Sequence, residues 1–210
     1  MENRLNSIMS KELLIIFVKN PELGRVKTRL AATVGDQNAL SIYKRLLERT
    51  KEVTVPLSVD KVVYYDLTMG SDDLWSNDGF NKDLQHQGDL GHRMSIAFEK
   101  SFQIGYNKVC IIGSDCFELT TEVLNTAFNA LDKTNAVIGG AKDGGYYLVG
   151  TSQFIPQIFE NKQWSTAEVY TDTIKDFKEL GHSFIELPKL NDIDREEDLG
   201  PWADELLKKN

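Results

Sequence analysis

The sequence predicts a three-layer α/β fold, in which helices cover both faces of a mixed, mainly parallel sheet. Two observations predict it. Short apolar or β-branched runs alternate with helix-length amphipathic stretches, and the first run, 13–18, is continuously apolar. A continuous apolar run is typical of a strand buried on both faces. Ligands of such sheets bind beyond the carboxyl ends of the strands. We therefore expect the functional residues directly after strands.

The expected strands are short runs rich in Val, Ile, Leu and Tyr. They occupy residues 13–18, 61–65, 108–113, 135–140, 146–150 and 184–187. The expected helices repeat apolar residues at helical spacing, as Leu40, Tyr43 and Leu47 do in the first of them. They occupy residues 36–53, 91–104, 120–132, 166–180 and 196–208. Residues 165–168, Ser-Thr-Ala-Glu, form a capping-box sequence at the start of the fourth helix.

Length, composition and charge favour one globular domain. The chain has 210 residues and is 41% hydrophobic, so we expect a single domain over 11–210 behind a flexible extension at 1–10. Its net charge of −8 makes nucleic acid and anionic membranes poor partners. Cys110 and Cys116 lack a metal or redox spacing, and we find neither a secretory leader nor a membrane-spanning run. We therefore expect a cytoplasmic protein.

Four cations follow the first expected strand of this acidic chain: Lys19, Arg25, Lys27 and Arg29. Gly24 turns the chain among them, and a turn before a helix leaves N–H groups free to bind an anion. Because Arg and Lys side chains bind phosphate oxygens, the pattern predicts a phosphate-binding loop. It is neither a P-loop nor a G-x-G-x-x-G motif. The alternative is a solvated loop with incidental basic residues.

Acidic residues follow two other expected strands. Asp115 comes just after the strand at 108–113, and Asp192 and Asp194 lie between the last strand and the last helix. Mg²⁺ and Mn²⁺ prefer oxygen ligands and bridge to substrate phosphates, so these carboxylates could hold such an ion. The alternative is that Asp115 turns the chain or caps a helix.

Two further segments give less specific indications of a function. Asp143-Gly144-Gly145 joins two expected strands, which indicates a hairpin, although paired glycines also let the backbone approach a ligand closely. Before the helix at 91–104, Asp89 could cap the helix or lie near a nucleotide, and Arg93 could face an anion.

Six motifs occur along the chain in a fixed order: FVKNPELGRVKTRL, QGDLGHRM, IGSDC, AKDGGYYLVG, WST and NDIDREEDL. This set resembles the DUF2064 family, whose glycosyltransferase-like members include proteins associated with arsenosugar biosynthesis. The resemblance covers about residues 13 to 199. It implies the nucleotide-diphospho-sugar transferase (GT-A) fold and a similarity to phospholactate guanylyltransferases.

The resemblance also implies roles for individual residues. Lys19, Gly24, Arg25, Lys27, Arg29, Asp89 and Arg93 would contact the phosphates or the nucleotide. Asp143, Gly144, Gly145, Trp164, Ser165 and Thr166 would contact the substrate on the acceptor side. Asp115 with Asp192 or Asp194 would bind Mg²⁺ or Mn²⁺. The chain departs from the family pattern at Phe117, Lys142 and Arg195, where proline, an acid and threonine are usual.

The expected function is metal-dependent group transfer. The resemblance favours a glycosyltransferase that uses a nucleotide-sugar donor and a small-molecule acceptor, with Asp143 as general base and Lys27 neutralising the leaving diphosphate. The alternative is a nucleotidyltransferase that uses a nucleoside triphosphate and a phosphorylated acceptor, which the four cations favour. A non-catalytic nucleotide sensor is a third alternative. The donor, the acceptor and the oligomeric state stay open.

Overall fold

A seven-stranded sheet forms the centre of the computed structural model, which describes residues 12–75 and 79–207. The strand order is β3-β2-β1-β4-β6-β5-β7. The strands are β1 (Glu12–Val18), β2 (Asp60–Tyr65), β3 (Phe80–Leu84), β4 (Lys108–Ile112), β5 (Ala136–Ala141), β6 (Tyr146–Thr151) and β7 (Phe184–Leu190). Only β6 runs antiparallel to its neighbours within this described sheet, as the predicted mixed, mainly parallel arrangement requires.

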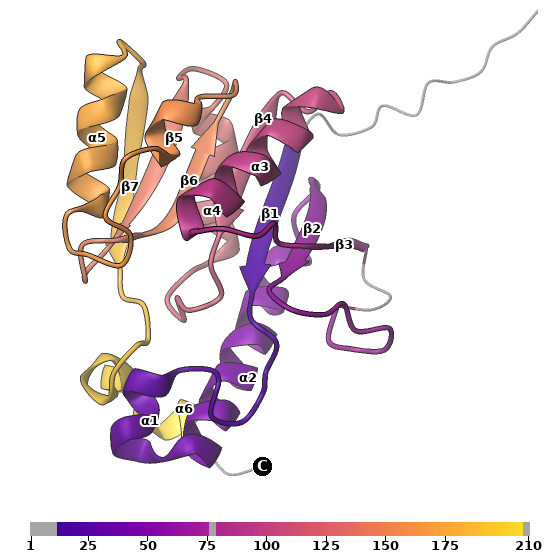
Figure 1. Ribbon diagram of the computed structural model, residues 1–210, viewed down its shortest axis with the longest axis vertical. Helices are drawn as coiled ribbons and strands as arrows, with labels where there is room; N and C mark the ends of the chain where they lie inside the picture. Colours follow the sequence, from indigo (N-terminus) through magenta and orange to yellow (C-terminus); the bar gives the residue numbers. More distant parts are fainter. Residues whose placement is uncertain (1–11, 76–78, 208–210) are drawn as a thin grey trace, which may run out of the picture.

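Helices cover both faces of the sheet. The α-helices are α1 (Thr28–Val34), α2 (Asp36–Thr54), α3 (Leu90–Gln103), α4 (Thr121–Ala130), α5 (Val169–Glu179) and α6 (Ala203–Leu206). Two 3₁₀ helices, η1 (Pro156–Phe159) and η2 (Glu196–Trp202), complete the described elements. In Figure 1, α1, α6 and η2 lie together at the lower end of the molecule.

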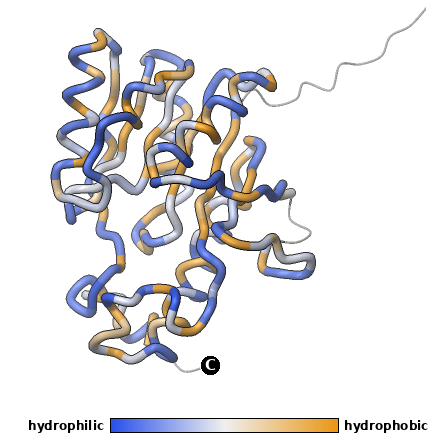
Figure 2. The backbone as a smooth tube through the Cα atoms, in the orientation of Figure 1, coloured by the Kyte–Doolittle hydropathy of each residue, from blue (hydrophilic) through white to orange (hydrophobic). Residues whose placement is uncertain are grey.

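The alternating side chains of β1 divide the core into two layers. Leu14 and Ile16 point to one face, where they pack with residues of α2 and α4. Leu13 and Ile15 point to the other face, where they pack with residues of α3, η1 and α5. Successive residues of a strand face opposite sides, so a continuously apolar strand serves both layers. Figure 2 shows this apolar character along the central strands. The three-layer α/β/α fold is therefore confirmed.

Two expected helices differ from the structure. The helix expected at 166–180 begins only at Val169, and Glu168 makes no side-chain cap, so the predicted capping box is wrong. Tyr170 N–H instead donates to Gly144 O at 2.9 Å, so residues before it form a turn against the β5–β6 hairpin. The helix expected at 196–208 is split into η2 and α6, because Gly200 has non-helical angles and Pro201 follows it. Residues 208–210 and the predicted extension at 1–10 lie outside the described residues.

Candidate functional site

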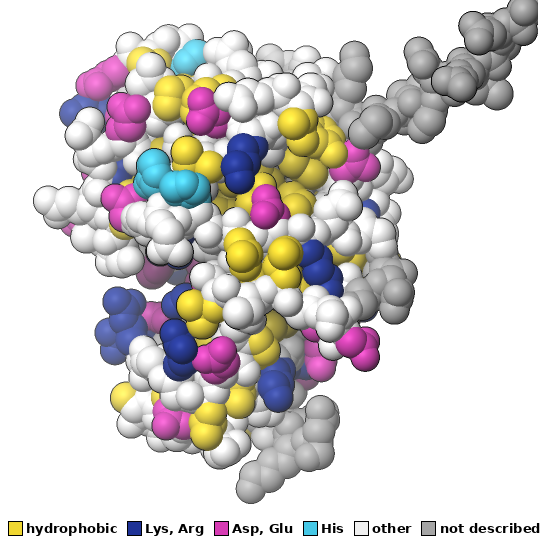
Figure 3. Space-filling model, turned by 45° about the vertical axis from the view of Figure 1, so that its right-hand side comes forward, with side chains coloured by type: hydrophobic (Ala, Val, Ile, Leu, Met, Phe, Trp, Pro, Cys, Tyr) yellow, Lys and Arg dark blue, Asp and Glu magenta, His cyan; other side chains and the backbone are white. Residues whose placement is uncertain are grey.

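A cavity of about 550 Å³ lies beyond the carboxyl ends of β1 and β4. Parallel neighbours end at the same sheet edge, so the segments that follow them come together there. Five basic side chains line this cavity: Lys19, Arg25, Lys27, Arg29 and Arg93. In Figure 3, Lys and Arg side chains gather beside a notch in the surface. The predicted phosphate-loop cations are therefore brought to one cavity, whereas Gly24 and Asp89 are outside its lining.

Lys27 is held at the centre of the site. Its backbone is left-handed, with φ 50° and ψ 42°, at the residue before α1. Only 4% of its side chain is exposed, and Nζ lies 2.8 Å from Asp115 Oδ1. The same ammonium donates to Ile193 O. Lys27 therefore joins the loop after β1 to the segments that follow β4 and β7.

The neighbouring arginines form more exposed ion pairs. Arg29 Nη1 lies 2.8 Å from Asp194 Oδ2, and this hydrogen bond raises the pKa of Arg29. Arg25 pairs with Glu22 at 3.1 Å, and its side chain is 60% exposed. Exposed pairs contribute little to folding, so both guanidinium groups can rearrange toward a ligand at small cost. Of the two acids expected after the last strand, Asp194 is the one engaged by an arginine.

Asp115 and Asp192 lie on adjoining segments. Ile193 N–H donates to Asp115 O at 2.8 Å, and Cys116 and Asp192 form an isolated antiparallel bridge. Asp192 Oδ1 is buried and accepts no hydrogen bond within the described chain. Burial, and next the charge of Asp115, raise the pKa of Asp192 to about 7. The charge of Lys27 lowers this pKa but does not offset the burial, so an ionised Asp192 would gain from a further cation, as a metal ligand does.

These carboxylates fit a partly formed metal site. No group of three or more His, Cys, Asp or Glu residues in the described chain could hold a metal alone. Mg²⁺, however, is commonly held by one or two carboxylates together with substrate phosphates. Asp115, which is half exposed and paired with Lys27, and Asp192, which has an unpaired buried oxygen, could serve as such carboxylates. The assignment of Mg²⁺ or Mn²⁺ to Asp115, Asp192 and Asp194 stays a prediction.

Asp143-Gly144-Gly145 forms the predicted hairpin between β5 and β6. The Asp143 carboxylate accepts from Gly145 N–H at 2.9 Å, and none of the three residues lines the cavity. Gly144 has φ 92°, and a Cβ there would lie 2.2 Å from Ala167 O. The glycine is therefore required by close packing of the turn before α5. The charge of Asp143 still acts on Arg29 and Asp192, so the hairpin lies near the site.

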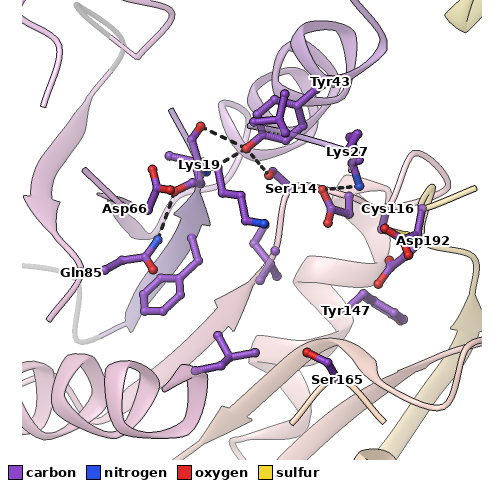
Figure 4. Close-up of a pocket in the computed structure, with 18 of the residues that line it drawn as sticks. Lys19, Lys27, Tyr43, Asp66, Gln85, Ser114, Cys116, Tyr147, Ser165 and Asp192 are labelled. Atoms are coloured by element: carbon purple, nitrogen blue, oxygen red, sulfur yellow. Dashed lines mark hydrogen bonds and ion pairs between the residues drawn. The ribbon is translucent and has the colours of Figure 1, made fainter. Parts of the chain in front are cut away.

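The WST segment contributes one residue to the cavity lining. Ser165 lies across the cavity from Lys27 in Figure 4, and its φ of 67° is unusual for a residue other than glycine. Trp164 packs edge-on against Tyr146, with ring centroids 6.4 Å apart. Thr166 Oγ1 donates to Gln163 O. Trp164 and Thr166 are thus held in the turn that presents Ser165.

The residues before α3 have separate roles. Asp89 accepts from His92 N–H at 2.8 Å and is the N-cap of the helix. Arg93 donates to Gln85 Oε1 at 3.0 Å and to Asp89 O. Only Arg93 of the predicted pair, Asp89 and Arg93, lines the cavity.

Sequence reasoning missed several lining residues. They are Phe17, Tyr43, Asp66, Gln85, Ser114, Tyr146 and Tyr147 among others. Asp66 follows β2 and Ser114 follows β4, so the rule that ligands gather after strands could have found both. Tyr43 lies within α2, where its apolar spacing indicates only a core residue. Figure 4 shows Asp66 and Gln85 on one side of the cavity and Lys27 and Asp192 on the other.

The three departures from the family pattern lie outside the cavity lining. Phe117 is buried and packs against Trp202, with two arginine side chains within 6 Å of its ring: Arg45 and Arg49. Lys142 is exposed. Arg195 is the N-cap residue of η2, and its N–H donates to Asp198 Oδ2.

Comparison with solved structures identifies the fold. A protein of Desulfovibrio desulfuricans G20, described as a candidate nucleotide-diphospho-sugar transferase, is 30% identical, with a TM-score of 0.83 over 95% of this chain and 97% of that one. A 4-diphosphocytidyl-2C-methyl-D-erythritol synthase from Anaerococcus prevotii DSM 20548 is 12% identical, with a TM-score of 0.58 over 95% and 97%. The inositol-1-phosphate CTP transferase of T. maritima is 14% identical, with a TM-score of 0.54 over 94% and 95%. The chain has the nucleotide-diphospho-sugar transferase fold.

The family follows from a separate comparison. The family model "Uncharacterized protein conserved in bacteria (DUF2064)" matches residues 49–166. The chain therefore belongs to the DUF2064 family, as its motifs indicate. No curated protein matches it. Among residues 12–75 and 79–207, no helix combines the length and apolarity needed to cross a membrane.

Proposed function

We propose that this protein is a nucleotide-dependent transferase that moves a nucleotidyl group from a nucleoside triphosphate to a phosphorylated small molecule. One observation carries the proposal: five basic side chains line a single cavity in a chain of net charge −8. Four aspartates share the lining, and a divalent ion on two of them, Asp115 and Asp192, would offset their charge and leave the cavity cationic. A triphosphate and an acceptor phosphate bring more negative charge than a nucleotide sugar and a neutral acceptor. A concentration of cations of this size favours the more highly charged pair of substrates.

In the proposed reaction, an oxygen of the acceptor phosphate attacks the α-phosphorus. The bond from that phosphorus to the bridging oxygen breaks, and pyrophosphate leaves with the bonding electrons. Lys27, Arg25 and Arg29 would neutralise the charge that develops on the leaving oxygens, and such preorganised contacts act mainly in the transition state. Asp115 and Asp192 would hold a divalent ion, which supplies further charge neutralisation when bound.

Glycosyl transfer is the second candidate. The 30% identity to the candidate nucleotide-diphospho-sugar transferase favours it, as does the charge of Asp143, which acts on the site from the hairpin. In this reaction the acceptor hydroxyl attacks the anomeric carbon and a nucleoside diphosphate leaves. Asp143 would need to reach the acceptor as general base, but its carboxylate accepts from Gly145 N–H outside the cavity lining.

A binding and product experiment tests the two reactions. The common nucleoside triphosphates and the corresponding diphosphate sugars are screened with Mn²⁺ by thermal shift, since a ligand at 100 times its dissociation constant adds about 2.7 kcal/mol to stability. Tightest binding of a triphosphate, followed by pyrophosphate release with a phosphorylated acceptor, supports nucleotidyl transfer. Tightest binding of a nucleotide sugar, with release of a nucleoside diphosphate, supports glycosyl transfer instead. Binding of neither class overturns both.

A further inference from the structure

Tyr43 brings a buried hydroxyl to the wall of the cavity. It lies in α2, only 2% of it is exposed, and it is among the largest fully enclosed side chains of the described core. Its ring packs in the core, while its hydroxyl reaches the carboxyl ends of β1 and β4, as Figure 4 shows. A core role alone would be met by phenylalanine, so the hydroxyl requires its own explanation.

The hydroxyl of Tyr43 forms hydrogen bonds with two neighbours, Lys19 and Ser114. Lys19 N–H donates to Oη at 2.8 Å, and Oη donates to Lys19 O at 3.1 Å. Ser114 Oγ lies 3.3 Å away. A phenol has one O–H and two acceptor lone pairs, so when its proton is directed to Lys19 O, the serine hydroxyl is the donor. Tyr43 therefore holds the backbone of Lys19 on both its N–H and its C=O, and Ser114 fixes the direction of the phenolic proton.

Lys19 is the first residue after β1, and its side chain lines the cavity. Lys27, Arg25 and Arg29 each form an ion pair, and Arg93 donates to Gln85. The Lys19 ammonium makes no hydrogen bond or ion pair within residues 12–75 and 79–207, and in Figure 4 it extends into the space between the two sides of the cavity. Among the described cavity cations, it is thus the one that a ligand can engage without first breaking an ion pair or a side-chain hydrogen bond.

We propose that Tyr43 is a positioning residue that fixes the backbone of Lys19 so that the Lys19 ammonium meets a phosphate of the bound nucleotide. The inference rests on the proposed nucleotide binding. A lysine side chain has four rotatable bonds and loses much rotamer freedom when it binds a ligand. When the backbone of Lys19 is already fixed, less conformational entropy is lost on binding, which is the general benefit of preorganisation.

A purely structural role for the hydroxyl makes a different prediction. Loss of a buried hydrogen bond lowers stability wherever it occurs, and this loss does not depend on whether Lys19 carries a charge. A positioning role instead requires that the effect on ligand binding disappear when the positioned ammonium is absent. A double-mutant cycle measures this dependence.

The experiment uses the full chain and inorganic tripolyphosphate with Mg²⁺, measured by calorimetry. The variants are Tyr43→Phe, Lys19→Met and the double variant, with Thr50→Val as the matched control. Thr50 is also a buried residue of α2, and its hydroxyl donates to Leu46 O at 2.8 Å. We expect Tyr43→Phe to weaken binding about tenfold, the equivalent of one hydrogen bond, but by less than about twofold in the Lys19→Met background. Thr50→Val should lower the melting temperature and leave binding unchanged.

Each other outcome overturns a defined part of the inference. Equal weakening by Tyr43→Phe in both backgrounds, or wild-type affinity in Tyr43→Phe, would overturn the positioning role while leaving phosphate binding intact. Failure of the wild-type chain to bind tripolyphosphate or any nucleotide would overturn the proposed function and the inference with it. Amide hydrogen exchange in the ligand-free protein adds an independent measurement, because Tyr43→Phe should speed exchange at Lys19 N–H and Thr50→Val should not.

Discussion

Lys27 Nζ lies 2.8 Å from Asp115 Oδ1, and the lysine side chain is almost completely buried while the carboxylate is half exposed. The pair joins the loop after β1 to the loop after β4, and the same ammonium donates to Ile193 O after β7. One side chain therefore holds together three segments that supply the candidate site. Its loss should change both the stability of the fold and the affinity for phosphate.

Lys27→Met should lower the free energy of unfolding by about 1–3 kcal/mol, because Ile193 O then loses its charged donor in a buried position. Urea unfolding of the ligand-free protein measures this change. Arg25→Ala is the matched control from the same loop. The side chain of Arg25 is 60% exposed and pairs with the exposed Glu22, so its loss should change stability by less than about 1 kcal/mol. Equal decreases in the free energy of unfolding would show that the Lys27 contacts stabilise the fold no more than an exposed ion pair does.

Asp115→Asn should keep the fold and remove the metal dependence of nucleotide binding. An amide is a weaker ligand than a carboxylate for a hard divalent cation. Calorimetry with a nucleoside triphosphate, in Mn²⁺ and in EDTA, measures the difference. Asp66→Asn is the control: Asp66 lines the same cavity, but it accepts from Asn20 N–H at the other side. Metal-dependent binding that survives Asp115→Asn unchanged would contradict the assignment.

The elements whose pattern reflects burial could be predicted from the sequence. Strands β1, β4 and β5 are apolar runs buried on both faces, and α2, α3 and α4 repeat apolar residues on one side. Strand β3, with the sequence FNKDL, was missed because it lies at the edge of the sheet and none of its residues is fully buried. Its three consecutive polar residues do not alternate with apolar ones, so the sequence lacks the two-residue period of a half-buried strand. The short helix α1 lies within the cationic segment, and its seven residues are too few to show a helical period, although Leu30 is buried.

The candidate site could be predicted only where position in the chain determines position in space. Arg29 and Asp115 follow parallel strands, and this topology brings them to one edge. The burial of Lys27 could not be predicted, because it depends on Ile193, 166 residues away. Tyr43 was predicted as a core residue, which is correct for its ring; the contacts of its hydroxyl depend on the packing of α2 against two strand ends.

Gly144→Ala should destabilise the protein more than Gly181→Ala. Both glycines have positive φ, 92° and 72°, so alanine would strain the backbone at either position by about 1–2 kcal/mol. At Gly144 the added Cβ would also lie 2.2 Å from Ala167 O, whereas at Gly181 it would meet no atom within 4 Å. Relief of the clash must move the turn that presents Ser165. Thermal unfolding measures the difference, and equal losses in melting temperature would contradict the close packing.

Asp192→Asn should stabilise the metal-free protein at neutral and alkaline pH and have less effect in acid. Burial and the Asp115 charge raise the pKa of Asp192 from 3.8 to about 7 in the folded state. Between these values the folded state holds a proton that the unfolded state has released, so ionisation costs the folded state stability as pH rises toward 7. Asparagine removes this charge. The melting temperature of Asp192→Asn minus that of the wild type, measured in EDTA, should therefore increase from pH 5 to pH 8.

Added Mn²⁺ provides the control for this pH dependence. If Asp192 helps to bind the ion, the metal supplies the missing positive partner, and the wild-type protein should regain stability at pH 8 while Asp192→Asn gains less. The unpaired, buried Oδ1 is the structural reason to expect this difference, since an oxygen without a donor can gain most from a cation. A difference in melting temperature that stays constant from pH 5 to pH 8 would show that Asp192 is not the group whose ionisation opposes folding. Equal gains with Mn²⁺ in the two proteins would place the ion elsewhere.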